Sequence, residues 1–204
     1  FSLNLFSTEQ DLSTQCWEID EIYQNMGLPP GQKYKIRVSP AFPIVGEENN
    51  VTLPIKDYPK MGRKLLEMMK EFPQLCFRFD CSFPPCLLDE IEEDEYPLVE
   101  RFIYHGGQSV PDITLWQDRD VYFGCADDSP MDIDPKGDCF NCFPFHNKKL
   151  GNVKDFKQIT ELAITKMHTQ FLSHAFEAQP NEPCKSCPHY MVRCSSGCFA
   201  YNFS

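Results

Sequence analysis

Four cysteines lie close together near the end of the chain, in the stretch PCKSCPHYMVRCSSGC at residues 183–198, which we call the tail loop. Two, six and three residues separate them in turn: Cys184, Cys187, Cys194 and Cys198. At Cys-x2-Cys spacing two thiolates can converge on one metal while the intervening amides hydrogen-bond the sulfurs, and so tight a turn suits a disulfide poorly. Gly197 can adopt the positive φ that a closely wrapped metal loop needs. The tail loop therefore predicts a metal site, and four thiolates suit tetrahedral zinc and a four-iron cluster equally well.

Further cysteines bear on the choice of metal. Seven of the eleven cysteines fall in the last 80 residues. The three of these that precede the tail loop are Cys125, Cys139 and Cys142. If the tail loop holds a zinc ion by itself, these three cysteines need a second zinc site, completed by His146. If the chain holds two iron–sulfur clusters that share the tail loop, all three can be cluster ligands. Cys16 and Cys76 lie on helix and strand patterns, so we expect them to be buried free thiols.

The charge balance and the cysteine count exclude several classes of protein. The chain has 19 Lys and Arg against 30 Asp and Glu, a net charge of -11, and no basic patch, so we expect neither a nucleic-acid partner nor binding to an anionic membrane. No run of about 18 apolar residues could span a bilayer, and the first residues lack the pattern of a signal peptide. A secreted disulfide protein is an alternative, since Asn50 and Asn202 are possible glycosylation sites. An odd, clustered set of cysteines instead favours a metal protein in the reducing cytoplasm.

The first 80 residues alternate between strand and helix patterns. The stretches FSLNLF, KYKIRVSP and QLCFRFD read as strands. Between them, residues 16–26 form a helical pattern that stops at Gly27, and a second helix is expected from Asp57 as N-cap with Pro59 in its first turn. The expected apolar positions of the two helices are Trp17, Ile19, Ile22, Tyr23 and Met26, then Met61, Leu65, Met68 and Phe72.

This β-α-β-α-β order predicts parallel strands joined by helical crossovers. A closed eight-stranded barrel takes about 250 residues, so we expect an α/β fold that is either half of a (β/α) barrel or a small open sheet.

The pattern changes after Asp80. The acidic run DEIEEDEY at residues 89–96 is expected to be a solvated surface segment. Two alternating strands over residues 113–125 read as a β-hairpin, and an amphipathic helix is expected from residue 155 to 176. We therefore predict a boundary near residues 90–110, between a barrel-like domain at 1–95 and a small α+β, cysteine-rich domain at 96–204.

These features together resemble a known family. The hairpin ending in Cys125, the GDCFNCF loop, the helix from residue 155 and CKSCPHYMVRCSSGC are similar to the SPASM extension of radical S-adenosylmethionine enzymes, where the last pattern reads Cys-x2-Cys-x5-Cys-x3-Cys. This chain has one more residue between Cys187 and Cys194, and Ser-Gly-Cys where Gly-Gly-Cys is common. The stretches KYKIRVSPAFPI, LPIKDYPKMGRKLL and FRFDCSFPPC look like the later strands of the family's partial barrel, so the resemblance covers nearly the whole chain.

The resemblance implies auxiliary 4Fe-4S clusters, one or two in number, that transfer electrons or bind substrate. It assigns three thiols to one cluster whose fourth ligand is absent or substituted, namely Cys184, Cys187 and Cys194. It assigns three others to the second cluster, namely Cys125, Cys142 and Cys198. Cys139 and Cys86 are the candidates to complete that second set.

The resemblance also implies S-adenosyl-L-methionine as cofactor and a peptide or protein as substrate. In a barrel, cofactors lie at the C-terminal ends of the strands, so Arg37 and Ser39 are expected to contact the cofactor, with Asp80 and the FRFDCS turn as further lining residues. The Cys-x3-Cys-x2-Cys loop that binds the cleaving cluster occurs nowhere in the sequence. We therefore expect a C-terminal segment of a longer enzyme, and the alternative is a non-enzymatic zinc-binding interaction module whose acidic segment meets a basic partner.

Overall fold

The computed structural model describes residues 1–29, 31–79, 84–99, 101–103, 123–124, 132–140, 142–155, 180–190, 192, 194–198 and 200–201. Cys125 and Asp80 lie outside these residues. So do the predicted hairpin, apart from two residues, and the predicted helix beyond Asp155. Within the described residues, no helix has the length and apolar character needed to cross a membrane.

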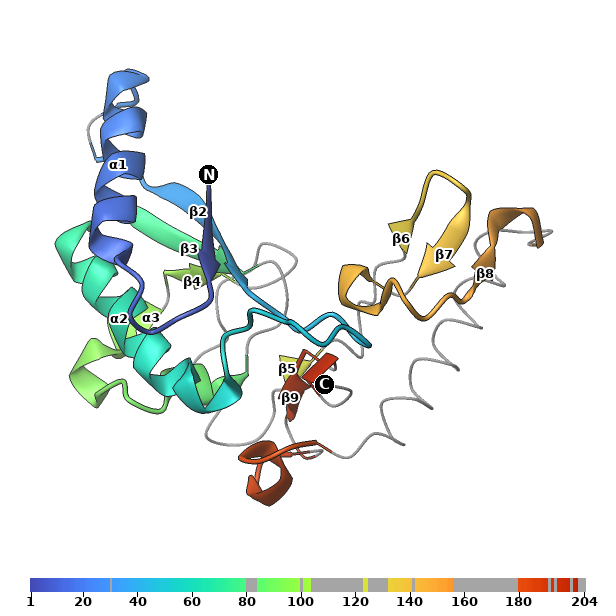
Figure 1. Ribbon diagram of the computed structural model, residues 1–204. Coiled ribbons are helices and arrows are strands. Elements are labelled where there is room, and N and C mark those ends of the chain that lie inside the picture. Colours follow the sequence, from blue (N-terminus) through green and yellow to red (C-terminus); the bar gives the residue numbers. More distant parts are fainter. Residues whose placement is uncertain are drawn as a thin grey trace.

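A four-stranded parallel sheet forms the centre of the first region (Figure 1). Its strands lie in the order β1-β2-β3-β4, and every neighbouring pair is parallel. The bounds are Ser2–Leu5 for β1, Tyr34–Pro40 for β2, Leu75–Phe79 for β3 and Phe102–Ile103 for β4. The predicted β-α-β-α-β order and the mixed α/β class are thus confirmed, and β4 extends the sheet beyond residue 95.

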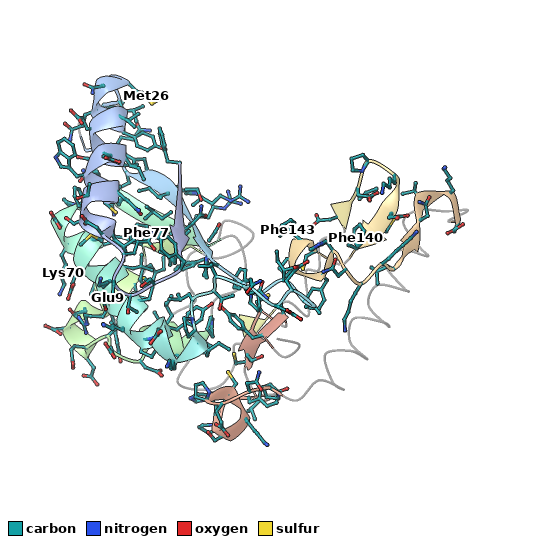
Figure 2. The ribbon with its side chains drawn as sticks, in the orientation of Figure 1. Glu9, Met26, Lys70, Phe77, Phe140 and Phe143 are labelled. Carbon is teal, nitrogen blue, oxygen red and sulfur yellow. The ribbon has the colours of Figure 1, made fainter. Side chains whose placement is uncertain are left out.

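The first helix, α1 (Leu12–Asn25), begins earlier than predicted because Asp11 caps it: the Asp11 carboxylate accepts a hydrogen bond from the Thr14 amide at 3.0 Å. The helix ends before Gly27, whose φ of +70° is the left-handed conformation expected there. The expected apolar stripe is largely wrong. Ile19 is buried as expected and Tyr23 packs against the core, but Trp17, Ile22 and Met26 are exposed (Figure 2 shows Met26 at the far end of the helix). The other side chains that the helix buries are Leu12, Cys16 and Asp20.

The second helix, α2 (Tyr58–Glu71), follows the short 3₁₀ helix η1 (Ile55–Asp57) and agrees better with its prediction. Pro59 lies in the first turn, and Asp57 is the N-cap residue although its side chain makes no capping hydrogen bond. Met61 and Leu65 are fully buried as expected. Figure 1 shows α1 and α2 side by side along one face of the sheet.

The two faces of the sheet differ sharply. Alternate residues of each strand bury their side chains against the helices, which makes one apolar core of Leu3, Leu5, Ile36, Val38, Leu75, Phe77 and Phe79 with α1 and α2. The remaining residues form the polar face, where the strand register aligns Ser2, Arg37 and Arg78 in one row across β1, β2 and β3. This division follows from the two-residue period of a strand. The polar face is the one that carries the predicted cofactor residues.

Buried charges fix the segments that follow α2 and β3. Arg101 is almost fully buried, and its guanidinium donates to backbone carbonyls of Met69 at 2.7 Å, Phe72 at 2.9 Å and Leu75 at 2.8 Å. It thereby pairs carbonyls left open at the end of α2.

The acidic run is more than a solvated segment. It contains the 3₁₀ helix η3 (Glu93–Glu95) and leads into α3 (Tyr96–Val99). Most of its carboxylates are exposed, but Glu95 is buried and pairs with Arg63 at 2.7 Å and with Lys70, both from α2. The prediction of a uniformly solvated segment is therefore wrong at Glu95, because α2 supplies two cations at that position.

The cysteine-rich region contains short elements. A small antiparallel sheet has the order β6-β7-β8, and β5 pairs in parallel with β9. The bounds are Phe123–Gly124 for β5, Asp132–Ile133 for β6, Asp138–Phe140 for β7, Gly151–Asn152 for β8 and Cys194–Gly197 for β9. The 3₁₀ helices are η4 (Phe143–Phe145), η5 (Val153–Asp155) and η6 (Cys184–Ser186).

The cysteine-rich region docks onto the first region at two places. The Tyr201 hydroxyl donates to the Leu53 carbonyl at 2.6 Å, and its ring packs in the core of the first region. The Val45 amide donates to the Pro144 carbonyl at 2.8 Å. These contacts join the two regions, so residues far apart in sequence can share one site.

Candidate metal centre

The tail loop begins with a single 3₁₀ turn that turns the Cys-x2-Cys pair back on itself. The Cys187 amide donates to the Cys184 carbonyl at 3.1 Å, and the Tyr190 amide donates to the Cys187 carbonyl at 3.1 Å. The chain then returns, and the Cys194 amide donates to the His189 carbonyl at 3.1 Å. The local hydrogen bonds therefore fold the first three cysteines of the tail loop into one compact turn.

Beyond Cys194 the backbone forms a concave group of amides. Ser196 has a φ of 67° and Gly197 a φ of 72°, so two successive residues are in the left-handed region. The positive φ predicted for Gly197 is confirmed. Both amides hydrogen-bond the Cys194 sulfur. Successive amides that point at one atom favour negative charge there, and so stabilise a thiolate.

Cys86 comes from a distant segment of the sequence, on the 3₁₀ helix η2 (Pro85–Leu88). This helix lies directly against α2 at Gly62, where a Cβ atom would be only 1.7 Å from the Leu87 carbonyl oxygen. Any residue other than glycine at position 62 would push η2 away. Gly62 therefore determines how close η2, and with it Cys86, lies to the helix.

Two contacts join η2 to the tail loop. A Cβ atom on Gly197 would lie 3.2 Å from Cδ of Pro84, so the last strand of the tail loop packs directly beside the residue that precedes η2. At the other end of η2, desolvation raises the pKa of Asp89, and the nearby His189 of the tail loop opposes that shift. The tail loop thus faces η2 along its length.

Cys86 is an electrostatic neighbour of the first three tail-loop cysteines. Burial raises the pKa of the Cys86 thiol, and Asp89 and the thiols of Cys194, Cys184 and Cys187 raise it further. Burial, with smaller effects of the Cys194 and Cys187 thiols, raises the pKa of Cys184 to about 12. All four are free thiols. Four cysteines from two separate segments therefore lie near enough for their charges to interact, and we call them the thiol quartet.

The quartet differs from an ordinary buried cysteine. Burial and, to a smaller degree, Glu71 raise the pKa of Cys16 to about 12, and no cysteine contributes to that shift. In the quartet, each additional thiolate would be disfavoured by the others unless a cation is present, because like charges repel. A metal relieves this repulsion and displaces the protons, so a group of buried thiols is suited to hold a metal rather than to remain empty.

The quartet is not a finished coordination shell. Among the described parts of the chain, no three His, Cys, Asp or Glu side chains are grouped so that they could hold a metal ion. The metal centre therefore rests on the neighbourhood of the four thiols and stays a proposal.

The other predicted ligands lie elsewhere. Cys139 is fully buried in β7; burial and, to a smaller degree, Asp138 raise the pKa of its thiol, and no cysteine contributes to the shift. Cys198 is buried in the core of the first region, and Cys142 packs against that core. The proposed second set of Cys125, Cys142 and Cys198 includes one residue outside the described parts of the chain, so that set stays a prediction.

Arg37 and Ser39 lie on the polar face of the sheet, as two alternate residues of β2. Arg37 is opposite Arg78 of β3, and Ser39 is opposite Asn4 of β1. The structure thus places the two predicted cofactor residues on one face, beside Arg78, which belongs to the FRFDCS segment named in the sequence analysis. Its neighbours Leu75, Phe77 and Phe79 are buried on the other face.

Sequence analysis named Cys86 only as a candidate for the second set, with Cys198, whereas the structure places it near the first three tail-loop cysteines. Gly62 was the available signal, since an isolated glycine inside a helical pattern often marks a close approach of another backbone. In comparisons with known proteins, no family model, no curated protein and no solved structure matches the chain.

Proposed function

We propose that the chain is a cluster-binding C-terminal segment of a radical S-adenosylmethionine enzyme that modifies a peptide or protein in the cytoplasm. The observation that carries the proposal is the packing of the tail loop on η2, with Gly197 beside Pro84, which brings Cys86 near enough to Cys184, Cys187 and Cys194 for their charges to interact. The sequence resemblance left the first auxiliary cluster with only three cysteine ligands. Cys86 supplies the fourth, and four thiolates are the complete ligand set of a 4Fe-4S cluster.

The residues around the quartet fit an iron–sulfur cluster. A bound cluster supplies electron transfer or a coordination site for substrate. The amides of Ser196 and Gly197 hydrogen-bond the Cys194 sulfur, and such bonds to thiolate ligands raise the reduction potential. Leu87 and Pro84 are buried beside the quartet and keep water from it on that side. On the sheet, the polar face with Arg37 and Ser39 offers hydrogen-bond donors to S-adenosyl-L-methionine, at strand ends where barrel enzymes hold their cofactors.

Metal analysis tests the proposal directly. Protein purified and reconstituted without oxygen is expected to be brown, with about four iron and four sulfide per chain for one cluster and about eight of each for two. A colourless protein with stoichiometric zinc would contradict the cluster and favour the zinc-binding interaction module. A protein that shows few thiols under denaturant, before any reductant is added, would instead be a disulfide protein.

Variants separate the quartet from other cysteines. Cys86→Ala and Cys184→Ala are each expected to lower the iron content by the equivalent of one cluster. Cys16→Ala is the control, because Cys16 is a buried free thiol and has no cysteine neighbour among the causes of its pKa shift. If iron content falls with Cys184→Ala but is unchanged by Cys86→Ala, Cys86 is excluded as a ligand, while the proposal of a cluster in the tail loop still holds.

A further inference from the structure

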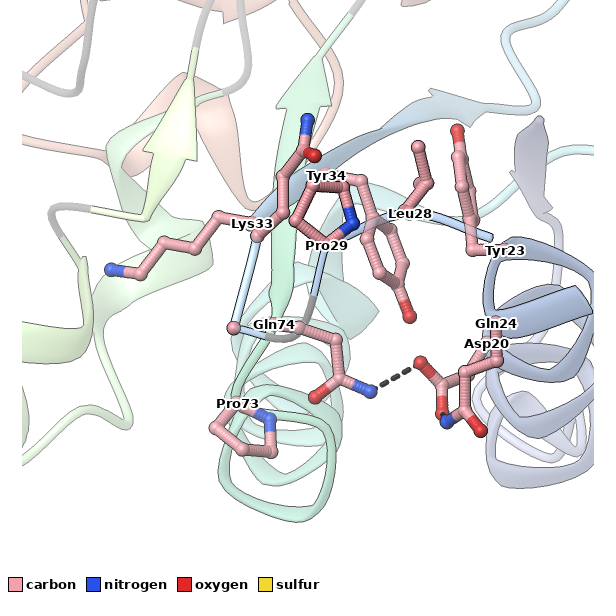
Figure 3. Close-up of a pocket in the computed structure, with 11 residues that line it drawn as sticks. Asp20, Tyr23, Gln24, Leu28, Pro29, Lys33, Tyr34, Pro73 and Gln74 are labelled. Carbon is pink, nitrogen blue, oxygen red and sulfur yellow. Dashed lines mark hydrogen bonds between the residues drawn. The ribbon is translucent and has the colours of Figure 1, made fainter. Parts of the chain in front are cut away.

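A pocket of about 540 Å³ opens at the end of the sheet opposite Ser39 (Figure 3). Its wall is formed by the last turns of α1, the first residue of β2 and the turn that precedes β3. The polar and aromatic residues that line it are Asp20, Tyr23, Gln24, Gln32, Lys33, Tyr34 and Gln74. The pocket therefore lies at the amino ends of the strands, whereas the predicted cofactor residue Ser39 lies near the carboxyl end of β2.

A buried carboxylate forms one side of the pocket. Asp20 is only 8% exposed. Its two oxygens accept hydrogen bonds from neutral amides, one from Gln24 Nε2 at 2.6 Å and one from Gln74 Nε2 (Figure 3). Asp20 forms no ion pair with any residue that the structure describes, and Figure 3 shows the Lys33 side chain extending away from it. The negative charge is thus hydrogen-bonded but not neutralised.

A tyrosine hydroxyl without a partner lies beside this carboxylate. Tyr34 is 9% exposed, and its hydroxyl has no hydrogen-bond partner in the described structure. In Figure 3 the hydroxyl points toward the Asp20–Gln74 pair. The Tyr34 ring stacks on Tyr23, with ring centroids 4.0 Å apart. A buried polar group that lacks a partner costs free energy, so the hydroxyl is suited to a ligand that completes it.

We propose that this pocket binds a guanidinium group, as carried by an arginine side chain. Asp20 supplies the opposite charge, and the Tyr34 hydroxyl oxygen accepts one of the guanidinium N–H bonds. Gln24 and Gln74 use their amide nitrogens on Asp20, which leaves their carbonyl oxygens as further acceptors.

A guanidinium fits this set better than other groups. It is planar, has five N–H donors in a fixed fork and stacks on tyrosine faces, whereas an ammonium ion has three donors on one atom. An anionic ligand would be repelled by Asp20. The net charge of -11 further favours a cationic ligand. The site does not depend on the proposed metal centre.

Titration calorimetry with matched probes tests the proposal. The probes are acetyl-Ala-Arg-Ala-amide, the same peptide with citrulline or lysine in place of arginine, and free arginine amide. Citrulline has nearly the shape of arginine but no charge. We expect the arginine peptide to bind at least tenfold more tightly than the citrulline and lysine peptides. If the arginine peptide binds more tightly than arginine amide, the guanidinium group belongs to a polypeptide ligand. If arginine amide binds more tightly than the peptide, the ligand is a small molecule.

Three variants complete the test. Asp20→Asn keeps the shape of the side chain and is expected to weaken binding of the arginine peptide at least tenfold, and Tyr34→Phe at least threefold. Glu21→Gln is the control, because it removes the same charge from an exposed neighbour in α1 and should leave binding unchanged. Thermal unfolding measures whether each variant is folded. If Asp20→Asn does not fold, the binding measured with Tyr34→Phe decides the test. Equal binding of the citrulline or lysine peptide, or arginine affinity unchanged by the folded pocket variants, would overturn the proposal.

Discussion

The parallel-sheet region and the tail loop hold their chains in place by different means. In the sheet region, long helices and strands bury a continuous apolar core, and buried charges such as Arg101 are satisfied by backbone carbonyls. In its described residues the tail loop has one 3₁₀ turn, one short strand and two residues in the left-handed region, and its buried side chains are largely thiols. The comparison suggests a test: the sheet region has an apolar core to hold it, whereas the proposed metal would hold the thiols of the tail loop together.

Removal of the proposed metal is expected to have the largest effect, and to affect only the tail loop. Because the metal would replace the missing apolar core of the tail loop, its loss should increase amide hydrogen exchange in residues 184–198 at least tenfold. Amides of β2 and β3 should keep their protection. Hydrogen exchange followed by mass spectrometry, before and after anaerobic chelation, measures both regions in one sample. Equal loss of protection in the sheet would show that the two regions are not independent.

A substitution at Gly62 should affect both regions. Gly62→Ala places a methyl group 1.7 Å from the Leu87 carbonyl oxygen, so η2 must move, and we expect a loss of about 3 kcal/mol in the free energy of unfolding. Because Cys86 moves with η2, bound iron should also fall. Urea unfolding and iron analysis measure the two effects. Gly27→Ala is the control: its Cβ atom meets nothing within 4 Å, so only the cost of its positive φ, about 1 kcal/mol, should appear, with iron unchanged.

Arg101 tests the sheet region alone. Arg101→Met keeps much of the side-chain volume but removes the guanidinium hydrogen bonds to the carbonyls of Met69, Phe72 and Leu75, so we expect a loss of about 2 kcal/mol in the free energy of unfolding. Urea unfolding measures this loss. Metal content per folded chain should not change, and a variant as stable as the parent would show that water replaces the guanidinium.

Gly197 tests the tail loop alone. Gly197→Ala adds a Cβ atom at a φ of +72°, 3.2 Å from Pro84, and we expect a cost of about 1 kcal/mol. The strain should appear as a shift of the visible absorption of the cluster and as faster loss of iron to a chelator, because Gly197 donates its amide to Cys194. Unchanged iron loss would contradict a role for this amide.

Acid should weaken the attachment of the acidic run to α2, and this is the smallest expected effect. A hydrogen bond from Lys70, together with the Glu92 amide and Arg63, lowers the pKa of Glu95 from 4.5 to about 2. A carboxyl group with a lowered pKa stabilises the fold above pH 4.5, and this contribution is lost as the pH falls from 4.5 toward 2. The free energy of unfolding should therefore decrease over this range, and Glu95→Gln should make that decrease smaller. Denaturant unfolding at a series of pH values measures the difference.

The strand and helix patterns predicted the parallel sheet correctly, because in its strands the two-residue alternation of apolar residues matches the side chains that are buried. Each of β1, β2 and β3 buries alternate residues, and Gly27 ends α1 as expected. The helix stripe failed at Trp17, Ile22 and Met26, because apolar residues that sit near one another on a helix need a partner surface, and α2 and the sheet contact the side that carries Cys16 and Ile19. The acidic run was misread at Glu95 for a similar reason, since the sequence pattern does not show Arg63 and Lys70 beside it.

By itself the sequence determined the elements whose causes are local. The Cys-x2-Cys turn, the left-handed Gly197 and the alternation of β2 depend on residues only a few positions away. Such local interactions can be inferred from the sequence without knowledge of the fold. Only the tertiary structure decided that Cys86 faces the tail loop and that Asp20, Tyr34 and Gln74 line one pocket. Each of these two groupings joins segments that are tens of residues apart. The packing of η2 on Gly62 determines the first, and the pairing of β2 with β3 determines the second. A local sequence pattern contains no information about either contact.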